Sequence, residues 1–450
     1  MRNEVLRIEA CKMSNTNAKL RDIHLNFYQG ELAGIIFDNM EEKHLFVSIF
    51  ETYKPIESGR IYINDEQINT QNLRKIVSKH ISLIGKESTL IEAFEVSENL
   101  FFNNFDYKNI FVKKRSARLK TETLFQKFSI SLSLKQQVAK LTFSEKIMLE
   151  ILKAYVQNHT IILLYQFTNR IDREHLKKLI ELMQLMIREG ITFILLDSYE
   201  EHIIKYAKRF FLISKGRTKG SYSQDTWSHE MLHTLGMNRM QEFPTSHNLP
   251  EANGVPILEF HHVTTGAIKD LNLTIWQGEF VILKCKDDGA IDDLTQLFHN
   301  EKKLHQNIGI INENALETML AKDITLLDNI MLNMFQRIPS FLPCTRYHPF
   351  IIKNLEEFIS PADLLSKAGD LCAEVQLKAL YYKWLLLNPK VVVCIKPFSV
   401  DVNHAPELIY NMIMTLIKQG IAVLFITANE SDADELKGRK ISIERITAET

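Results

Sequence analysis

The sequence predicts an α/β protein built from two similar halves, each containing a largely parallel β-sheet. Short apolar runs alternate with amphipathic stretches along the chain, which is typical of strands and helices that alternate within one domain. Two of the runs, 161–164 (IILL) and 391–394 (VVVC), hold no polar residue, as expected for strands covered on both faces. A chain of 450 residues is also too long for a single hydrophobic core.

Two blocks of sequence recur at one spacing. Residues 153–165 (KAYVQNHTIILLY) resemble 383–395 (KWLLLNPKVVVCI), and 190–196 (GITFILL) resemble 420–426 (GIAVLFI), each 230 positions later. Two similar strand segments end at Gly30-Glu31 and at Gly278-Glu279, which are 248 positions apart. The smaller spacing of the later blocks predicts that the second half has lost residues and is the more eroded.

The domain boundaries follow from these blocks and from composition. Residues 227–256 lie between the two similar halves. They carry glycines and prolines among polar side chains, which is typical of a linker. We therefore expect a first domain over 1–226, a linker over 227–256 and a second domain over 257–450.

Composition narrows the classes of function. Lys and Arg (54) nearly balance Asp and Glu (55), so global charge offers no case for nucleic acid or for attraction to anionic lipid. The five cysteines have no metal-site spacing, and no histidine pair has a metal-binding pattern. The start of the chain (MRNEVLRIEACKMSN) indicates a first strand, and the apolar runs at 391–395 and 421–426 are shorter than the ~20 residues that a membrane span needs. We expect a cytoplasmic protein that inserts no segment into a membrane.

Four motifs carry a family resemblance. They are 53–61 (YKPIESGRI), 95–101 (EVSENLF), 141–155 (LTFSEKIMLEILKAY) and 383–394 (KWLLLNPKVVVC). In this order they resemble the ATP-binding subunit of bacterial ribose- and galactose-type sugar ABC importers, in which two nucleotide-binding domains are fused. The resemblance covers nearly the whole chain. It implies two tandem P-loop NTPase-like domains, each with a mainly parallel sheet, an antiparallel strand region and a helical subdomain.

The resemblance places the first phosphate loop at 37–45 (FDNMEEKHL). Such a loop needs glycines for close approach to phosphate, a Lys for the β- and γ-phosphates and a Ser or Thr for Mg²⁺. The residues that stand in place of the glycines and the hydroxyl pair are Phe37, Met40, Glu42, His44 and Leu45. Asn39 and Lys43 remain as candidate nucleotide contacts. Lys43 is either a retained phosphate contact or a solvated lysine at a helix start, and Glu41 beside Glu42 adds repulsion toward a polyanion.

The second phosphate loop falls at 285–292 (CKDDGAID) and departs further from the family pattern. Ile291 occupies the lysine position, while Asp288 and Ala290 replace glycines. Four carboxylates crowd the place of the triphosphate: Asp287, Asp288, Asp292 and Asp293. Because their spacing fits no Ca²⁺ or Mg²⁺ loop, we expect a solvated acidic helix start there.

Hydrolysis requires an Asp for Mg²⁺ and a Glu for the attacking water at the end of a buried strand. The resemblance maps this pair to Tyr165 and Gln166 in the first half, and to Ile395 and Lys396 in the second. It maps the Mg²⁺-sensing Gln to Lys86, the switch His to Ser198, the adenine-stacking aromatic to Ser14, and the second signature loop to Cys372, Ala373 and Glu374. We expect none of these positions to be catalytic.

The resemblance therefore implies an ABC transporter subunit whose family activity, ATP hydrolysis coupled to carbohydrate import, has been lost. We expect a pseudo-ATPase that docks on sugar-permease subunits, or on a competent ABC ATPase, at the inner face of the membrane. The cluster 113–120 (KKRSARLK) lies where the family's helical subdomain faces the permease, although a solvated helix face is the favoured interpretation. A soluble regulatory module and a weak ATP binder or divergent ATPase using the first domain stay open as alternatives. No Mg²⁺ is expected.

Overall fold

The computed structural model describes residues 3–15, 18–85, 88–101, 114–165, 167, 171, 173–196, 205–223, 225, 254–266, 268–286, 288–300, 308–334, 344–400, 402 and 405–443. The chain divides into two compact units, Met1–Met237 and Asn238–Thr450. This division falls within 227–256, the interval expected to be a linker, of which 227–253 lie outside the described residues. No helix in the described ranges is long and apolar enough to cross a membrane.

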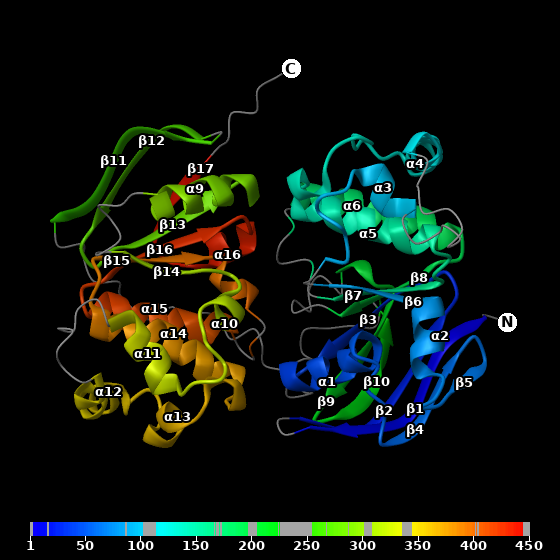
Figure 1. Ribbon diagram of the computed structural model, residues 1–450, viewed down its shortest axis with the longest axis horizontal. Helices are drawn as coiled ribbons and strands as arrows, with labels where there is room; N and C mark the ends of the chain where they lie inside the picture. Colours follow the sequence, from blue (N-terminus) through cyan, green and yellow to red (C-terminus); the bar gives the residue numbers. More distant parts are fainter. Residues whose placement is uncertain are drawn as a thin grey trace. The chain divides into compact units, whose positions relative to one another are not determined.

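The described strands of the first unit form one ten-stranded sheet (Figure 1). They are β1 (Glu4–Ser14), β2 (Lys19–Tyr28), β3 (Leu32–Phe37), β4 (Ser58–Ile63), β5 (Glu66–Ile68), β6 (Ile81–Ile84), β7 (Ile161–Tyr165), β8 (Thr192–Leu196), β9 (Arg209–Ser214) and β10 (Arg217–Ser223). Strands β6-β7-β8-β3-β9 pair parallel in that order. Strands β5-β4-β1-β2 pair antiparallel and join the rest through β10.

The second unit repeats the parallel part of this arrangement. Its strands are β11 (Pro256–Thr265), β12 (Ile268–Trp276), β13 (Phe280–Cys285), β14 (Ile308–Ile311), β15 (Val391–Ile395), β16 (Ala422–Thr427) and β17 (Arg439–Ile443). Strands β14-β15-β16-β13-β17 are parallel, and β11-β12 form a separate antiparallel pair. Position by position, this order matches β6-β7-β8-β3-β9. Mainly parallel sheets with an antiparallel region, as predicted, are therefore confirmed. His261 and His262 lie within β11.

Helices cover both faces of each parallel sheet. Those of the first unit are α1 (Met40–Glu51), α2 (Leu73–His80), α3 (Val96–Phe101), α4 (Lys114–Phe128), α5 (Phe143–Val156) and α6 (Arg173–Arg188). Those of the second are α9 (Asp288–Asn300), α10 (Ala315–Thr318), α11 (Leu326–Met334), α12 (His348–Leu355), α13 (Pro361–Leu365), α14 (Ala373–Leu387), α15 (Ala405–Lys418) and α16 (Glu430–Glu435). Short 3-10 turns lie at Val138–Lys140, Cys344–Tyr347, Ala368–Asp370 and Pro397–Ser399.

The shortening predicted for the second half has a structural location. In the first unit β4, β5 and α2 lie between α1 and β6, whereas only residues 301–307 separate α9 from β14. That interval is too short to hold two strands and a helix. The spacing thus falls from 248 at the first helix (40 to 288) to 227 at the next parallel strand (81 to 308), and it is 230 from α3 and α11 onward (96 to 326).

Strand β7 shows how the sheet of the first unit is buried. Because successive side chains point to opposite faces, Ile162 and Leu164 pack into the core that contains α5 and α6. Ile161 and Leu163 pack into the core that contains α1 and β2. All five residues of β7 and all five of the matching β15 are buried. Fully apolar strands covered on both faces, as predicted, are confirmed.

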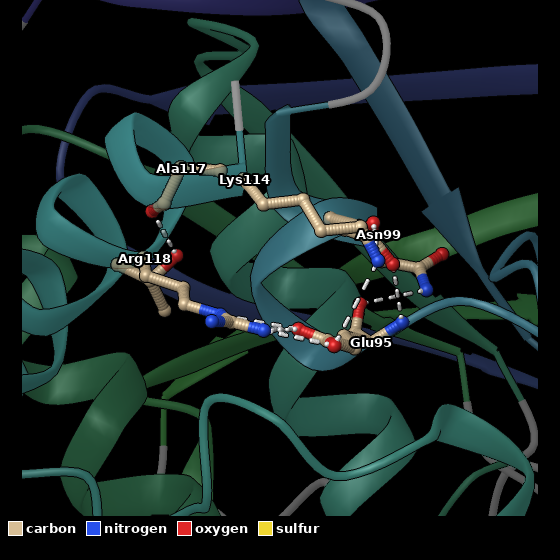
Figure 2. Close-up of polar contacts among 7 residues, drawn as sticks. Glu95, Asn99, Lys114, Ala117 and Arg118 are labelled. Atoms are coloured by element: carbon tan, nitrogen blue, oxygen red, sulfur yellow. Dashed lines mark hydrogen bonds and ion pairs between the residues drawn. The ribbon is translucent and has the colours of Figure 1, made fainter. Parts of the chain in front are cut away.

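A buried asparagine organises the loop before α3 in the first unit and the loop before α11 in the second. The Asn99 side chain on α3 accepts from Ile91 N at 2.8 Å and donates to Ile91 O at 3.0 Å (Figure 2). Asn329 on α11, 230 positions later, makes the same two bonds to Ala321, at 2.8 and 2.9 Å. The two amides hold equivalent loops, although these residues lie outside the two blocks that revealed the spacing.

A lysine also recurs at this spacing, fully buried as Lys383 and half-buried as Lys153. Lys383 on α14 is 3% exposed, and its Nζ lies 5.0 Å from the ring centroid of Trp384. Burial lowers the pKa of Lys383 to about 8, because a low-dielectric surrounding disfavours the charged form. Burial likewise lowers the pKa of the equivalent Lys153 on α5, whose Nζ donates to Thr89 O.

Replacing Lys383 with Met is expected to raise the free energy of unfolding at pH 7 by about 1–3 kcal/mol. Between pH 8 and 10.5 the unfolded chain holds a proton that the native protein has lost, so native stability rises with pH in this window. The variant should lose that rise. Urea unfolding of both proteins from pH 7 to 10 measures the difference. The exposed Lys390→Met is the matched control, and a variant that keeps the wild-type pH dependence would contradict the assignment.

Candidate functional site

The first phosphate-loop segment joins β3 to α1. Strand β3 is buried along its whole length, and Asn39 begins the helix by accepting a hydrogen bond from Glu42 N at 3.1 Å. An Asn at this position satisfies one of the free N–H groups of the first helical turn. The side chain of Asn39, one of the two candidate nucleotide contacts, is thus engaged as a helix cap.

Lys43, the other candidate, points into the protein. It is 1% exposed, so its interpretation as a solvated lysine is wrong. Its Nζ lies 5.4 Å from the ring centroid of Tyr165, at the end of β7. A cation over an aromatic face gains electrostatic stabilisation that partly offsets its desolvation. The phosphate-loop lysine therefore contacts the position that the resemblance maps to the Mg²⁺-binding aspartate.

Tyr165 also binds the residue next to that lysine. Its hydroxyl lies 2.8 Å from His44 Nδ1, and the two rings meet edge to face with centroids 6.0 Å apart. His44 stands where the family has the Mg²⁺-binding hydroxyl. Two positions that a metal–nucleotide complex would bridge are therefore joined directly by side chains of the chain itself.

Glu42 turns its carboxylate away from this contact. It is 8% exposed, and one of its oxygens accepts from Gly216 N at 2.8 Å. Burial raises the pKa of Glu42, and Asp38 nearby adds to the rise, whereas the bond from Gly216 and the charge of Arg21 oppose it. The carboxylate ties α1 to the turn between β9 and β10.

The second phosphate-loop segment has an apolar interior. Ile291 at the lysine position is 3% exposed and packs with Ala290 in the core between α9 and β13. Asp292 is exposed, but Asp293 is 9% exposed, so a solvated interpretation is wrong for Asp293. Its carboxylate lies where a side chain on Gly266 would stand. Asp287, and the side chain of Asp288, lie outside the described residues.

An ion pair lies at the end of β15. Ile395 is 5% exposed, and Lys396, in a left-handed conformation, is 8% exposed. Lys396 Nζ lies 3.7 Å from Glu313 Oε2, on the segment that follows β14. Sequence reasoning missed Glu313, because no motif marks it and its neighbour is far along the chain. A lysine therefore sits where hydrolysis requires a carboxylate.

Some of the other positions that the family resemblance maps lie among the described residues, and the rest do not. Cys372 begins α14 without a side-chain hydrogen bond, and Glu374 pairs with Lys378 on the next turn, at 2.7 Å. By contrast, Thr142 caps α5 through a reciprocal pair of bonds with Glu145. Ser14 hydrogen-bonds to Glu57. The last group, Lys86, Gln166 and Ser198, lies outside the described residues.

Two of the basic residues in 114–120, Lys114 and Arg118, form ion pairs within the helical region of the first unit. Arg118 on α4 binds both carboxylate oxygens of Glu95, the shortest contact being 2.8 Å (Figure 2). Lys114 Nζ lies 2.9 Å from Glu98 on α3. These contacts hold α4 against α3, so this part of the helix is more than a solvated face.

Residues 20–169 match the family model described as ABC transporter. Curated relatives named Ribose import ATP-binding protein RbsA are 22% identical in Yersinia pestis and Bacillus subtilis, over 91% and 93% of this chain and 86% and 90% of theirs. A Nucleoside import ATP-binding protein, NupA of Lactococcus lactis, is 22% identical over 90% of this chain and 86% of its own. The solved structure of cbiO1 from Clostridium perfringens is 18% identical, with a TM-score of 0.45 over 52% of this chain and 96% of that one.

The predicted fold is thereby confirmed: an α/β chain with two fused ABC ATPase-like domains of the P-loop type. The chain is similar in sequence, over nearly its full length, to ATP-binding subunits of importers. The strand order places the end of β7 beside the start of α1, as a P-loop nucleotide site requires.

Replacing Glu313 with Gln is expected to lower the free energy of unfolding by about 1–2 kcal/mol, since a mostly buried lysine loses its carboxylate partner. Adding Lys396→Met should restore part of the loss, because the remaining buried charge is then gone. Urea unfolding of the two variants measures both effects. Equal destabilisation by Glu313→Gln and by the exposed Glu317→Gln would contradict the importance of the pair.

Proposed function

We propose that the chain is an ATP-binding-type subunit of a sugar-import system that no longer hydrolyses ATP and acts as a structural or regulatory subunit. One observation carries this proposal. In each unit, side chains at the positions for metal and nucleotide contact other side chains of the same unit. The similarity to import ATP-binding proteins supports the transport context.

At the described phosphate-loop and β7 positions of the first unit, other side chains stand in place of the groups for metal-assisted phosphoryl transfer. Mg²⁺ prefers carboxylate and hydroxyl oxygens with several waters, but Tyr165 and His44 bind each other at 2.8 Å. Lys43 lies over the same ring rather than in solvent. For a triphosphate to bind in the family manner, both contacts must be broken. This supports a site that the protein itself has closed.

In the second unit, the residues at the mapped positions have the wrong charge, or no charge, for phosphoryl transfer. Ile291 cannot attract phosphate, and Lys396 cannot accept a proton from an attacking water while it is protonated. Its contact with Glu313 places an ion pair at the end of β15. These replacements support the absence of hydrolysis independently of the first unit.

Polar contacts order the helical region of the first unit. Arg118 and Glu95 form a bidentate pair across the helical region of the first unit, and Asn99 fixes the loop before α3. In the family resemblance this region faces the transmembrane subunit. The proposed partners are therefore sugar-permease subunits or a competent ABC ATPase, and the proposed location is the inner face of the membrane, reached through such a partner.

With Mg²⁺ and ATP, the full chain is expected to release no phosphate above the level of a Lys43→Met variant. The physical reason is that, among the described residues at the mapped positions, neither unit pairs a metal-binding carboxylate with a general base. A continuous phosphate-release assay at several protein concentrations measures this. Release that scales with wild-type protein and disappears in Lys43→Met would refute the pseudo-ATPase proposal.

Permease subunits are expected to co-purify with the tagged full chain from membranes of its native host. Arg118→Gln, which loosens α4 from α3, should reduce the recovered permease by about three-fold or more, since docking needs an ordered surface. Arg115→Gln removes the same charge from an exposed neighbour and is the matched control. If no permease subunit is recovered with wild-type protein, the soluble regulatory alternative replaces the docking proposal.

A further inference from the structure

Strand β11 of the second unit has an open edge within the described structure. In the first unit the equivalent strand, β1, lies between β2 and β4 and pairs antiparallel with both. Among the strands that the structure describes, β12 alone pairs with β11, and the two form a separate ribbon (Figure 1). The edge that β4 covers in the first unit therefore has no described counterpart to cover it in the second.

The two strands correspond residue by residue. Residues 5–11 (VLRIEAC) align with 257–263 (ILEFHHV), and buried positions alternate with more exposed ones in the same phase. Both strands bulge at the same point, where Ala10 (φ 46°) and His262 (φ 54°) have a left-handed backbone. Because β1 pairs with β4 ahead of this bulge, the same bulge leaves the corresponding part of β11 competent to pair.

The open edge presents the backbone groups of alternate residues. In the first unit Asn64 N donates to Val5 O at 3.0 Å, next to the register between β1 and β4. Alternate residues of an antiparallel strand direct their N–H and C=O groups to the same neighbour. By the alignment, Ile257, Glu259 and His261 direct theirs away from β12. Such a row of donors and acceptors is a template for an added strand.

Complementary side chains cross this edge in the first unit. Arg7 lies opposite Tyr62, and its guanidinium carbon is 4.4 Å from the centroid of that ring. Glu9 lies opposite Arg60, so an acid meets a base. Opposite charges and cation–aromatic contacts both stabilise paired strands. The positions that follow Val5 on the β4 side are thus the ones that select the pairing strand.

On β11 the same two positions hold an acid and a base. Glu259 and His261 have side chains that are 48% and 69% exposed, and they share one face, with His261 Nε2 3.9 Å from Glu259 Oε2. A two-fold axis through Phe260 would set Glu259 of each copy opposite His261 of the other. An axis through Glu259 would set two carboxylates against each other, which is destabilising. A neutral imidazole still donates one N–H to a carboxylate, so the match does not require a charged histidine.

We propose that two copies of the chain pair antiparallel through the open edge of β11, with Glu259 of each copy opposite His261 of the other. Each such pair of outward-facing residues exchanges two backbone hydrogen bonds, which gives about four in the interface. The contact uses the same patch on both copies, so it closes as a dimer. It supplies the second unit with the strand pairing that β4 supplies in the first. The inference does not depend on the transport role.

Sedimentation velocity of the full chain over about 1–100 µM tests the proposal, and wild type should show a dimer that forms with rising concentration. Glu259→Lys places a lysine opposite His261 and should raise the dimer dissociation constant about ten-fold or more. The matched control is Glu356→Lys, the same charge change at an exposed residue after α12, which should stay within about two-fold of wild type.

A charge swap separates lost complementarity from lost folding. Glu259→His/His261→Glu changes both positions but keeps an acid opposite a base, so its dissociation constant should return to within about three-fold of wild type. Amide hydrogen exchange over 257–262 should slow as the dimer forms, because the outward N–H groups become bonded.

Three results would overturn the proposal. The first is a chain that stays monomeric, including one whose amides over 257–262 already exchange slowly because the edge is covered within the chain. The second is a dimer that Glu259→Lys leaves intact. The third is a folded swap variant that dimerises as weakly as Glu259→Lys, since complementary charge would then not set the pairing.

Discussion

Burial of the parallel strands on both faces is the constraint on which the rest of this structure depends. Each residue of β7 and β15 packs into one of two cores, above or below its sheet. Polar groups are costly along such a strand, so the first positions free of this constraint are those at its end. Tyr165 is the last buried residue of β7, and Lys396 is the first residue after β15, so both lie at this end of their sheets. The strand order of each sheet therefore decides which side chains Tyr165 and Lys396 contact.

The two units stabilise a buried lysine in different ways. A lysine removed from water needs a compensating group. In the first unit Lys43 lies over the Tyr165 ring, which stabilises a cation without adding a second charge. In the second unit Lys396 pairs with Glu313, a carboxylate from a neighbouring segment. The first solution is aromatic and the second ionic, which is consistent with independent divergence of the two sites.

Some polar contacts away from these sites are equivalent in the two units. Asn99 and Asn329 hold the same kind of loop, and Arg209 and Arg439 each bind a glutamate that follows a strand turn, Glu31 and Glu279 respectively. A buried amide that satisfies backbone groups, such as that of Asn99 or Asn329, is expensive to lose. These side chains therefore support the architecture itself, whereas the residues around the phosphate loops have been free to change their chemistry.

The sequence by itself determined the fold class, the two similar halves and the fully buried strands, because apolar periodicity and a recurring spacing are local signals. It also located the phosphate-loop segments through the resemblance. It could not place Lys43 inside the protein, join Tyr165 to His44, or pair Lys396 with Glu313. Each of these joins segments distant in the chain, and sequence carries no sign of which strands become neighbours. Only the tertiary structure decided them, since the burial of a charge depends on what packs around it.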